Sequence, residues 1–231
     1  MKYTLTFTLF IVVNCLFGQS LSESLKKAND VTSQLKKFSY EVNYISFSRS
    51  GVIAESKMKV EKVDEVIYTR MDQIDSYVLD STSVLIDHSD KVVLLNIGVK
   101  NLTVNQNITK QLEMVKELER KAEKVSSQIR GDIIEYTLVF TENEFKQVLL
   151  TFEKSTGFFK SMKLDNRDPI YNYKDTEEEP AVSYEITIKN YNTNLSKLSK
   201  PISEILDLKE GRYFLKPKYS TYQFDNNYDW Y

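Results

Sequence analysis

Short segments in which apolar and polar side chains alternate recur through much of the chain. In the segments 38–44 and 182–188 every second side chain is apolar or aromatic, and in 54–60 every second side chain is charged. Successive side chains of a strand point to opposite faces, so this pattern predicts strands with one packed face and one wet face. Antiparallel sheets are commonly built in this way.

Further strands are predicted from short runs rich in β-branched and aromatic residues. The sequence "HSDK" at 88–91 predicts a turn, so Val84–Ile86 and Val92–Leu95 are expected to pair as a hairpin. Gly157 suits a turn position that needs a positive φ. The polar segment 165–180, with both local prolines, predicts a surface loop. The remaining runs lie at 64–73, 76–88 and 91–97, and three more strands are predicted within 132–166.

Two segments carry apolar residues at the three- and four-residue spacing of a helix. The first is Leu21–Leu35. The second, 104–129, has apolar residues at positions 104, 108, 112, 115, 118, 122, 125 and 129. At about 100° per residue these positions cover an arc of about 140°, wider than the seam of a two-helix coiled coil. The pattern therefore favours a lid that lies across the sheet over an arm that recruits a partner.

The first eighteen residues have the pattern of a secretory signal peptide. Lys2 precedes the uncharged apolar run Leu5–Val13, and Gly18 offers a small residue for cleavage. A run of this length matches a signal peptide and is too short to span a bilayer. We therefore expect an exported, periplasmic protein in which 1–18 is removed and 19–231 forms one domain. The alternatives are an outer-membrane lipoprotein attached through Cys15 and a secreted protein.

The charge balance narrows the range of partners. Lys2 would leave with the signal peptide, so the cleaved chain has 30 basic and 33 acidic residues and a net charge of −3. This balance argues against a nucleic-acid partner and against broad electrostatic attachment to anionic lipid. No later stretch is long and apolar enough to form a transmembrane segment.

The residues that most catalytic and metal sites require are scarce. His88 is the only histidine, and Cys15, the only cysteine, lies in the predicted signal peptide. This excludes His/Cys metal sets and Cys–His or Ser–His–Asp nucleophiles. The acidic run Glu177–Glu179 lacks the alternating oxygen ligands of a calcium loop and is interpreted as a solvated turn. We therefore predict no enzyme activity, no cofactor and no metal, with His88 as a surface imidazole in its turn.

The last 21 residues, 211–231, are predicted to be loop-like but contain eight aromatic side chains. A free tail should not expose so many aromatic rings. Two interpretations stay open: the tail packs on the chain's own sheet, or it contacts an envelope protein partner.

The order of the predicted elements resembles that of the periplasmic lipoprotein carrier and outer-membrane lipoprotein receptor superfamily (LolA/LolB-like). The resemblance implies an unclosed antiparallel barrel covered by helices, with acyl chains inside. The sequence departs from the family pattern in two places. Asp80-Ser81 stands where Asp-Gly is usual. The early arginine-rich strand that helps to hold the carrier's lid is represented by Arg70 at best. The stretches that carry the resemblance are "LKKFSYEVNY", "YVLDSTSVLIDHSDKVVLLN" and "LTFEKSTGFFKSMKLDN…AVSYEITIKNYNTN".

These observations predict an α+β fold: a curved antiparallel sheet (an unclosed β-barrel) covered by an N-terminal helix and a long central helix. The space between sheet and helices is either a filled core or an apolar cavity for a lipid-like ligand. The leading hypothesis is an exported, non-enzymatic protein that binds a hydrophobic or acylated ligand, a lipid or a lipoprotein acyl chain. The alternative is a structural or assembly accessory of the envelope that acts through protein contacts. The residues predicted to line the cavity are Leu112, Val115, Leu118, Tyr136, Leu138, Phe152, Ile186 and Ile188.

Overall fold

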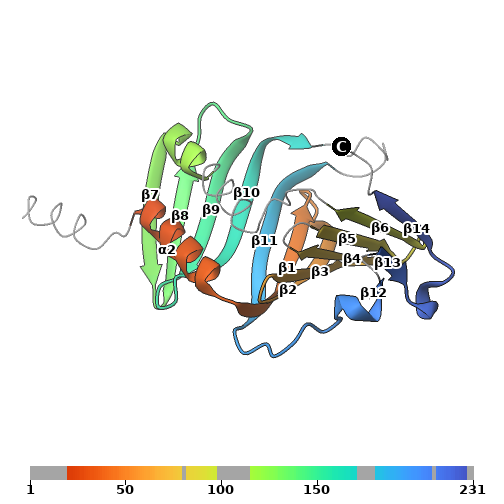
Figure 1. The fold of residues 1–231 in the computed structure, drawn as a ribbon. Coiled ribbons are helices and arrows are strands. Elements are labelled where there is room, and N and C mark those ends of the chain that lie inside the picture. Colours follow the sequence, from red (N-terminus) through yellow and green to blue (C-terminus); the bar gives the residue numbers. More distant parts are fainter. Residues whose placement is uncertain (1–19, 80–81, 98–114, 171–179, 210–211, 228–231) are drawn as a thin grey trace, which may run out of the picture.

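The computed structural model describes residues 20–79, 82–97, 115–170, 180–209 and 212–227 (Figure 1). Twelve strands form one sheet in the order β14-β6-β5-β4-β3-β2-β1-β11-β10-β9-β8-β7. Neighbouring strands run antiparallel, except that β14 is parallel to β6. The end strands β14 and β7 do not pair with each other, so the curved sheet is unclosed. The predicted fold class, an open and curved antiparallel sheet with helices, is confirmed.

The strands follow the predicted runs closely, and the predicted hairpin is confirmed because Val84 lies opposite Leu95 and Ile86 opposite Val93. A separate two-stranded ribbon, β12 with β13, and two short 3-10 turns complete the described elements. The bounds are β1 Lys37–Phe47, β2 Val52–Val63, β3 Val66–Met71, β4 Ile74–Leu79, β5 Thr82–Asp87, β6 Val92–Ile97, β7 Lys124–Arg130, β8 Ile133–Val139, β9 Phe145–Glu153, β10 Phe159–Ile170, β11 Ala181–Asn192, η1 Ile202–Glu204, β12 Leu206–Lys209, β13 Arg212–Leu215, η2 Pro217–Tyr219 and β14 Gln223–Asn227.

The predicted N-terminal helix is present as α2 (Leu21–Gln34). Ser20 caps it: its hydroxyl accepts from the backbone N–H of Glu23, while the Glu23 carboxylate accepts from the N–H of Ser20. This reciprocal arrangement satisfies two backbone donors that a helix start would otherwise leave unpaired. Leu21 and Leu25 are buried, as their spacing predicts.

The prediction of one helix over 104–129 is wrong in its last third. Residues 115–121 are helical, but Lys124–Arg130 forms the strand β7, and 104–114 lies outside the described residues. Val125 and Ile129 share a face in a strand as well as in a helix, so their four-residue spacing fits both. The whole of β7 pairs with β8, and Gly131, with φ at 61°, supplies the tight turn between them. The backbone pairing thus decides the structure of this segment.

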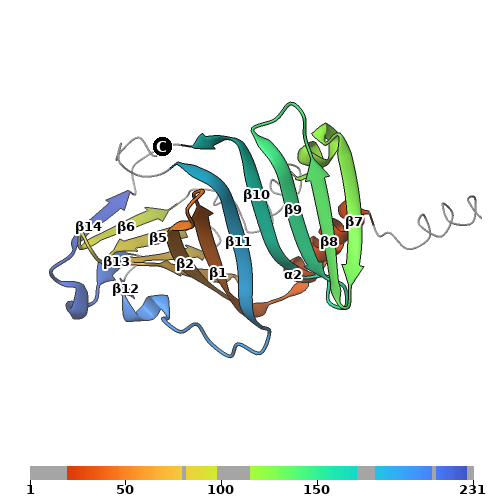
Figure 2. The same cartoon turned by 180° about the vertical axis from the view of Figure 1, so that it is seen from behind.

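The sheet has two faces that are packed differently. Residues opposite one another on neighbouring strands share a face. One such row, across β1, β11, β10, β9 and β8, lies on what we call the helix face, because α2 packs there. Figures 1 and 2, seen from front and back, show α2 on a single side of β8 and β9. The row consists of Tyr44, Ile186, Met162, Leu150 and Tyr136.

The other side of the sheet, the opposite face, carries a second core over β3–β6. The row that marks it is Glu61, Tyr68, Tyr77, Val84 and Leu95. These strands are covered by the tail segment, defined here as residues 198–209 and 212–227, which contributes Leu198, Ile205, Leu206 and Tyr219 to the core. The sheet is therefore covered at its two ends from opposite sides.

Two further predictions need correction. The segment 165–180 is not a loop throughout, because β10 continues to Ile170, while 171–179 lies outside the described residues. The tail 211–231 is not simply loop-like, since β13, η2 and β14 lie within it and β14 pairs with β6. Tyr219 is 3% exposed, so the described part of the tail packs on the chain's own sheet.

Candidate ligand site

The β7–β10 end of the helix face is a filled core, which we call the closed end. Leu21 and Leu25 of α2 pack against buried side chains of β8 and β9, and Val115 packs there from the segment 115–121. Leu138 is 0% exposed and Phe152 is 1% exposed. A core of this kind is close-packed, with little room for a guest.

Polar contacts fix α2 over the closed end. The Ser24 hydroxyl and the Tyr136 hydroxyl are 2.7 Å apart, and Tyr136 also donates to the carbonyl oxygen of Ser20 at 3.2 Å. Burial raises the pKa of Tyr136, so this hydroxyl stays protonated and able to donate. The Lys27 ammonium donates to the carbonyl oxygen of Lys154 at 2.8 Å, in the turn between β9 and β10. The helix is thus fastened along its first two turns.

The turn under Lys27 requires a glycine. Gly157 has φ at 82°, as the sequence predicted, and a Cβ there would lie 2.7 to 2.9 Å from carbon atoms of the Lys27 side chain. A larger residue would push Lys27 aside as well as strain the backbone. Glycine at this position avoids both the backbone strain and the contact with Lys27.

The helix face becomes more open over β1, β2 and β11. Phe38, Val42 and Val60 are buried there, but the apolar side chains around them are only half-buried. We call these half-buried side chains the central apolar surface. Half-buried apolar groups side by side are what an apolar ligand would cover, since burying each one gains free energy. They are Leu35, Tyr40, Tyr44, Met58, Ile67, Ile186, Ile188 and Tyr191.

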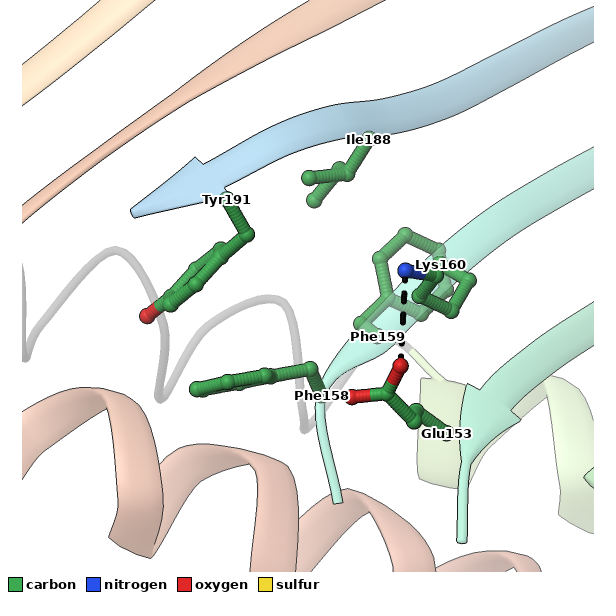
Figure 3. Close-up of a pocket in the computed structure, with 6 residues that line it drawn as sticks. All are labelled: Glu153, Phe158, Phe159, Lys160, Ile188 and Tyr191. Carbon is green, nitrogen blue, oxygen red and sulfur yellow. Dashed lines mark ion pairs between the residues drawn. The ribbon is translucent and has the colours of Figure 1, made fainter. Parts of the chain in front are cut away.

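A pocket of about 220 Å³ opens at one edge of this surface (Figure 3). Ile188 and Tyr191 of β11 line one side, and the Phe158 ring lies against Tyr191, tilted by 35° with ring centroids 3.9 Å apart. Phe159 forms the opposite wall, beside an ion pair between Lys160 and Glu153 at 3.7 Å. Three of the six lining residues are aromatic, one is aliphatic and two form the ion pair.

Stacked aromatic rings connect the pocket to the rest of the central apolar surface. Tyr191 stacks on Tyr40 at 6.0 Å and on Phe38 at 6.2 Å. Burial raises the pKa of Tyr40 to about 12 and that of Tyr191 well above its ordinary value. The buried Tyr191 hydroxyl has no hydrogen-bond partner among the described residues. A buried hydroxyl without a partner costs free energy, and such groups are rare in folded proteins.

Beyond β2 the helix face has exposed apolar side chains. The row from Tyr40 continues through Val60, Thr69, Ser76 and Leu85. Leu85 is 36% exposed. Met71 and Ile74, on the same face near the β3–β4 turn, are 40% and 38% exposed. Exposed apolar side chains therefore recur on the helix face as far as β5, with the polar Thr69 and Ser76 among them.

The structure separates the eight predicted cavity residues into two groups. Val115, Tyr136, Leu138 and Phe152 belong to the closed end, with Leu118 packed against them. Ile186 and Ile188 lie on the central apolar surface, and Leu112 lies outside the described residues. That all eight line one ligand cavity stays a prediction.

Sequence reasoning missed the aromatic side chains of the pocket. Tyr40 alternates onto the same face as Val42, so strand periodicity could have found it. Tyr191 is three residues from Ile188 and reaches this face only because the register of β11 shifts beside Asn190, whose φ is 55°. Strict alternation would have placed Tyr191 on the other face. Phe158 follows the turn glycine, and no local pattern indicates where its ring points.

His88 lies in its predicted turn, but the prediction of a surface imidazole is wrong. Its side chain is 17% exposed, and its Nε2 lies 2.8 Å from Oδ2 of Asp75, which is fully buried. Asp75 also accepts from the Tyr68 hydroxyl at 2.8 Å and from the Lys200 ammonium. The Tyr222 hydroxyl, 2.9 Å from His88 Nδ1, completes this polar cluster. The cluster joins the sheet to the tail segment, which the local sequence around His88 does not indicate.

The charge of Asp75 is stabilised where it is buried. Burial by itself raises the pKa of this carboxyl, but hydrogen bonds from Lys200, His88 and Tyr68 outweigh that effect and hold the pKa below its usual value. Glu61, 1% exposed, accepts from the backbone N–H of Ser199 at 2.6 Å and pairs with Lys59. Two buried carboxylates thus hold consecutive residues at the start of the tail segment.

Metal-binding clusters and membrane-spanning helices are both absent from the described residues. No group of three or more His, Cys, Asp or Glu side chains in those ranges could hold a metal ion. No helix in the same ranges is long and apolar enough to cross a membrane.

No model of a known protein family matches the chain, and no curated protein sequence matches it significantly. Solved structures are similar at a distance. An uncharacterised conserved protein from Thermus thermophilus is 7% identical over 90% of this chain and 99% of its own, with a TM-score of 0.46. MucB, in complex with MucA from Pseudomonas aeruginosa, is 12% identical over 77% of this chain and 58% of its own, with a TM-score of 0.44.

A LolA superfamily protein from Nitrosomonas europaea is 9% identical over 78% of this chain and 96% of its own, with a TM-score of 0.32. The sequence predicted a distant resemblance to this superfamily, and this member of it is among the similar structures. At such TM-scores the similarity does not extend to ligands or partners.

Proposed function

We propose that the protein is an exported, non-enzymatic binding protein that holds a hydrophobic or acylated ligand on the helix face of its sheet. The observation that supports this most is the central apolar surface with its pocket. It lies between a filled core at one end and exposed apolar side chains at the other. A surface meant only to pack would be buried, whereas this one is left half-buried over β1, β2, β3 and β11.

The pocket alone is small. Its volume of about 220 Å³ is below the range of roughly 300 to 1,000 Å³ that is usual for sites of drug-sized ligands. The ligand would therefore place one end in the pocket between Phe158, Phe159 and Ile188 and lie along the central apolar surface. A long, thin apolar chain, such as the acyl chain of a lipid or lipoprotein, has that shape.

The location that we propose is the periplasm. The signal-peptide pattern at 1–18 is the basis, and it lies outside the described residues. The residues of the polar cluster around Asp75 are used in holding the tail segment, so we assign it no chemistry.

Lipid extraction from the purified protein, followed by mass spectrometry, tests the function directly. A co-purifying lipid or fatty acid is expected, and titration with a fluorescent fatty acid should show saturable binding. Absence of both would refute the proposal.

A filled pocket should weaken the binding of the fluorescent fatty acid. Ile188→Trp places a larger side chain in the pocket, and we expect about a tenfold loss of affinity for the fluorescent fatty acid. The matched control is Lys189→Trp, on the next residue of β11, where the side chain is exposed. Equal affinities for the two variants would place the ligand elsewhere.

The alternative, an envelope accessory that acts through protein contacts, drew on the aromatic tail. Tyr213, Tyr219, Tyr222 and Phe224 pack in or against the opposite-face core. Among the described aromatic side chains of the tail, only Phe214 is largely exposed. We therefore do not propose this function.

A further inference from the structure

The β12–β13 ribbon has the most exposed large apolar side chain of the described residues. Leu208 is 62% exposed, and Phe214 on the other strand is 49% exposed. The base of the same ribbon is packed, because Leu206 is buried and Leu215 lies opposite it against the opposite-face core. The ribbon thus has a fixed base and projects two large apolar side chains into solvent.

These two side chains lie on different faces of the ribbon. Leu208 lies opposite Tyr213, and Phe214 lies opposite Asp207. Since partners share a face and successive residues alternate, Leu208 and Phe214 point to opposite sides. A protein surface laid against the ribbon would cover one of them and leave the other in water. A lipid layer can surround both.

The charges around the ribbon favour an anionic surface. Lys209 and Arg212 lie directly opposite each other, an unfavourable arrangement for two like charges within a sheet. Both side chains are exposed, and neither forms an ion pair with a described residue. Residues 206–218 contain four basic and two acidic side chains in a chain of net charge −2. Exposed apolar side chains flanked by Lys and Arg are typical of segments that bind anionic membrane interfaces.

We propose that the β12–β13 ribbon docks the protein on an anionic lipid bilayer, with Leu208 and Phe214 inserted among the acyl chains and Lys209 and Arg212 at the phosphates. This is local attachment through one ribbon and needs no broad basic surface. Docking on a bilayer rests on the proposed function and deepens it. A protein that binds an acyl chain must collect the chain from a bilayer or deliver it to one.

Flotation with vesicles tests the proposal on the full chain. The wild-type protein should float with vesicles of phosphatidylethanolamine and phosphatidylglycerol, and less with vesicles of phosphatidylcholine alone. The double variant Leu208→Ser/Phe214→Ser should bind the anionic vesicles at least about tenfold more weakly. The variant Lys209→Gln/Arg212→Gln should bind the anionic vesicles about tenfold more weakly at low salt, and its binding should depend less on the salt concentration.

The matched control is Val52→Ser/Ile53→Ser, which removes apolar side chains of similar exposure, 59% and 41%, from the start of β2. It should float like the wild type. The proposal is overturned if the wild type does not float with anionic vesicles, if the Leu208/Phe214 variant floats equally well, or if the control loses as much.

The two proposals can fail separately. In the absence of vesicles, the Leu208→Ser/Phe214→Ser variant should bind the fluorescent fatty acid with wild-type affinity, since neither residue lines the central apolar surface. If the wild type does not bind the fatty acid, the proposed function is refuted, but the flotation result still stands. Flotation that is unaffected by the ribbon variants refutes the ribbon but leaves ligand binding intact.

Discussion

The two ends of the sheet are covered from opposite sides and held by different chemistry. At the closed end, α2 lies over β8 and β9, and its most buried polar contact joins two neutral hydroxyls, those of Ser24 and Tyr136. At the β3–β6 end the tail segment lies over the opposite face, and the buried carboxylates of Asp75 and Glu61 hold its first residues. One end depends on packing, and the other depends also on buried charge.

The reason for the difference lies in the covering elements. A helix such as α2 satisfies its own backbone and can present an apolar stripe. Residues 198–201, which precede η1, form no helix or strand, so their polar groups need partners from the sheet. Glu61 accepts from the backbone of Ser199, and Asp75 accepts from the side chain of Lys200. The sheet must therefore bury two charges to hold an irregular segment.

The largest effect is expected from removing the charge of Asp75. Asp75→Asn leaves Lys200 beside a neutral amide and cannot accept all of the same hydrogen bonds. Breaking a buried ion pair on one side typically costs about 3–5 kcal/mol. Urea denaturation should show a loss of that size. Arg70→Gln is the control: Arg70 is half-exposed and 3.9 Å from Asp75, so its loss should cost less than about 1 kcal/mol. Similar losses for both variants would mean that the buried contacts of Asp75 contribute no more to the free energy of unfolding than its contact with Arg70.

A cavity at the closed end should cost somewhat less. Leu138→Ala removes a fully buried side chain from β8, and such substitutions cost about 2–5 kcal/mol. Val139→Ala, one residue on and facing the other way at 37% exposure, should change the free energy of unfolding by less than about 0.5 kcal/mol. Denaturation of both variants checks this. A small effect of Leu138→Ala would indicate that the closed end is loosely packed and could itself admit a ligand.

Acid should weaken the two ends unequally. The pKa of Asp75 is lower in the folded protein than its usual value, so its contribution to stability is complete above about pH 4 and is lost as pH falls through the folded pKa. Hydrogen exchange between pH 5 and pH 3 should show β4 and β5 losing protection before β8 and β9. In Asp75→Asn, the difference in protection between the two ends should no longer depend on pH. Simultaneous loss at both ends in the wild type would contradict it.

Much of this fold could be predicted from the sequence because strand alternation and turn residues are local signals. Gly157, at a positive φ, is one example. In the turn at 88–91, the Asp87 side chain accepts from the backbone N–H groups of Ser89 and Asp90. The segment 124–130 could not be assigned in this way, since the spacing of Val125 and Ile129 fits a helix and a strand equally. Its pairing with β8 depends on the rest of the sheet.

The candidate site was only partly predictable for the same reason. Periodicity places Ile186 and Ile188 on an apolar face, and both lie on the central apolar surface. It cannot tell which part of that face a helix will fill, so Tyr136 and Phe152 were grouped with them but belong to the closed end. The polar cluster joins His88 to two side chains that lie more than a hundred residues further along the chain, Lys200 and Tyr222. No local pattern encodes a contact of that range.

The smallest expected effect comes from removing one tyrosine hydroxyl, either at the closed end or in the pocket at the centre of the sheet. Tyr136→Phe, at the closed end, removes the partner of Ser24 and should cost about 1 kcal/mol. Tyr191→Phe, in the pocket, removes a buried hydroxyl that has no partner among the described residues, and should be neutral or stabilising by less than about 1 kcal/mol. Urea denaturation of the two variants compares the same chemical change at two sites. A clear destabilisation by Tyr191→Phe would show that its hydroxyl has a structural role, and the central apolar surface would then be packed like the closed end, with less reason to expect a ligand there.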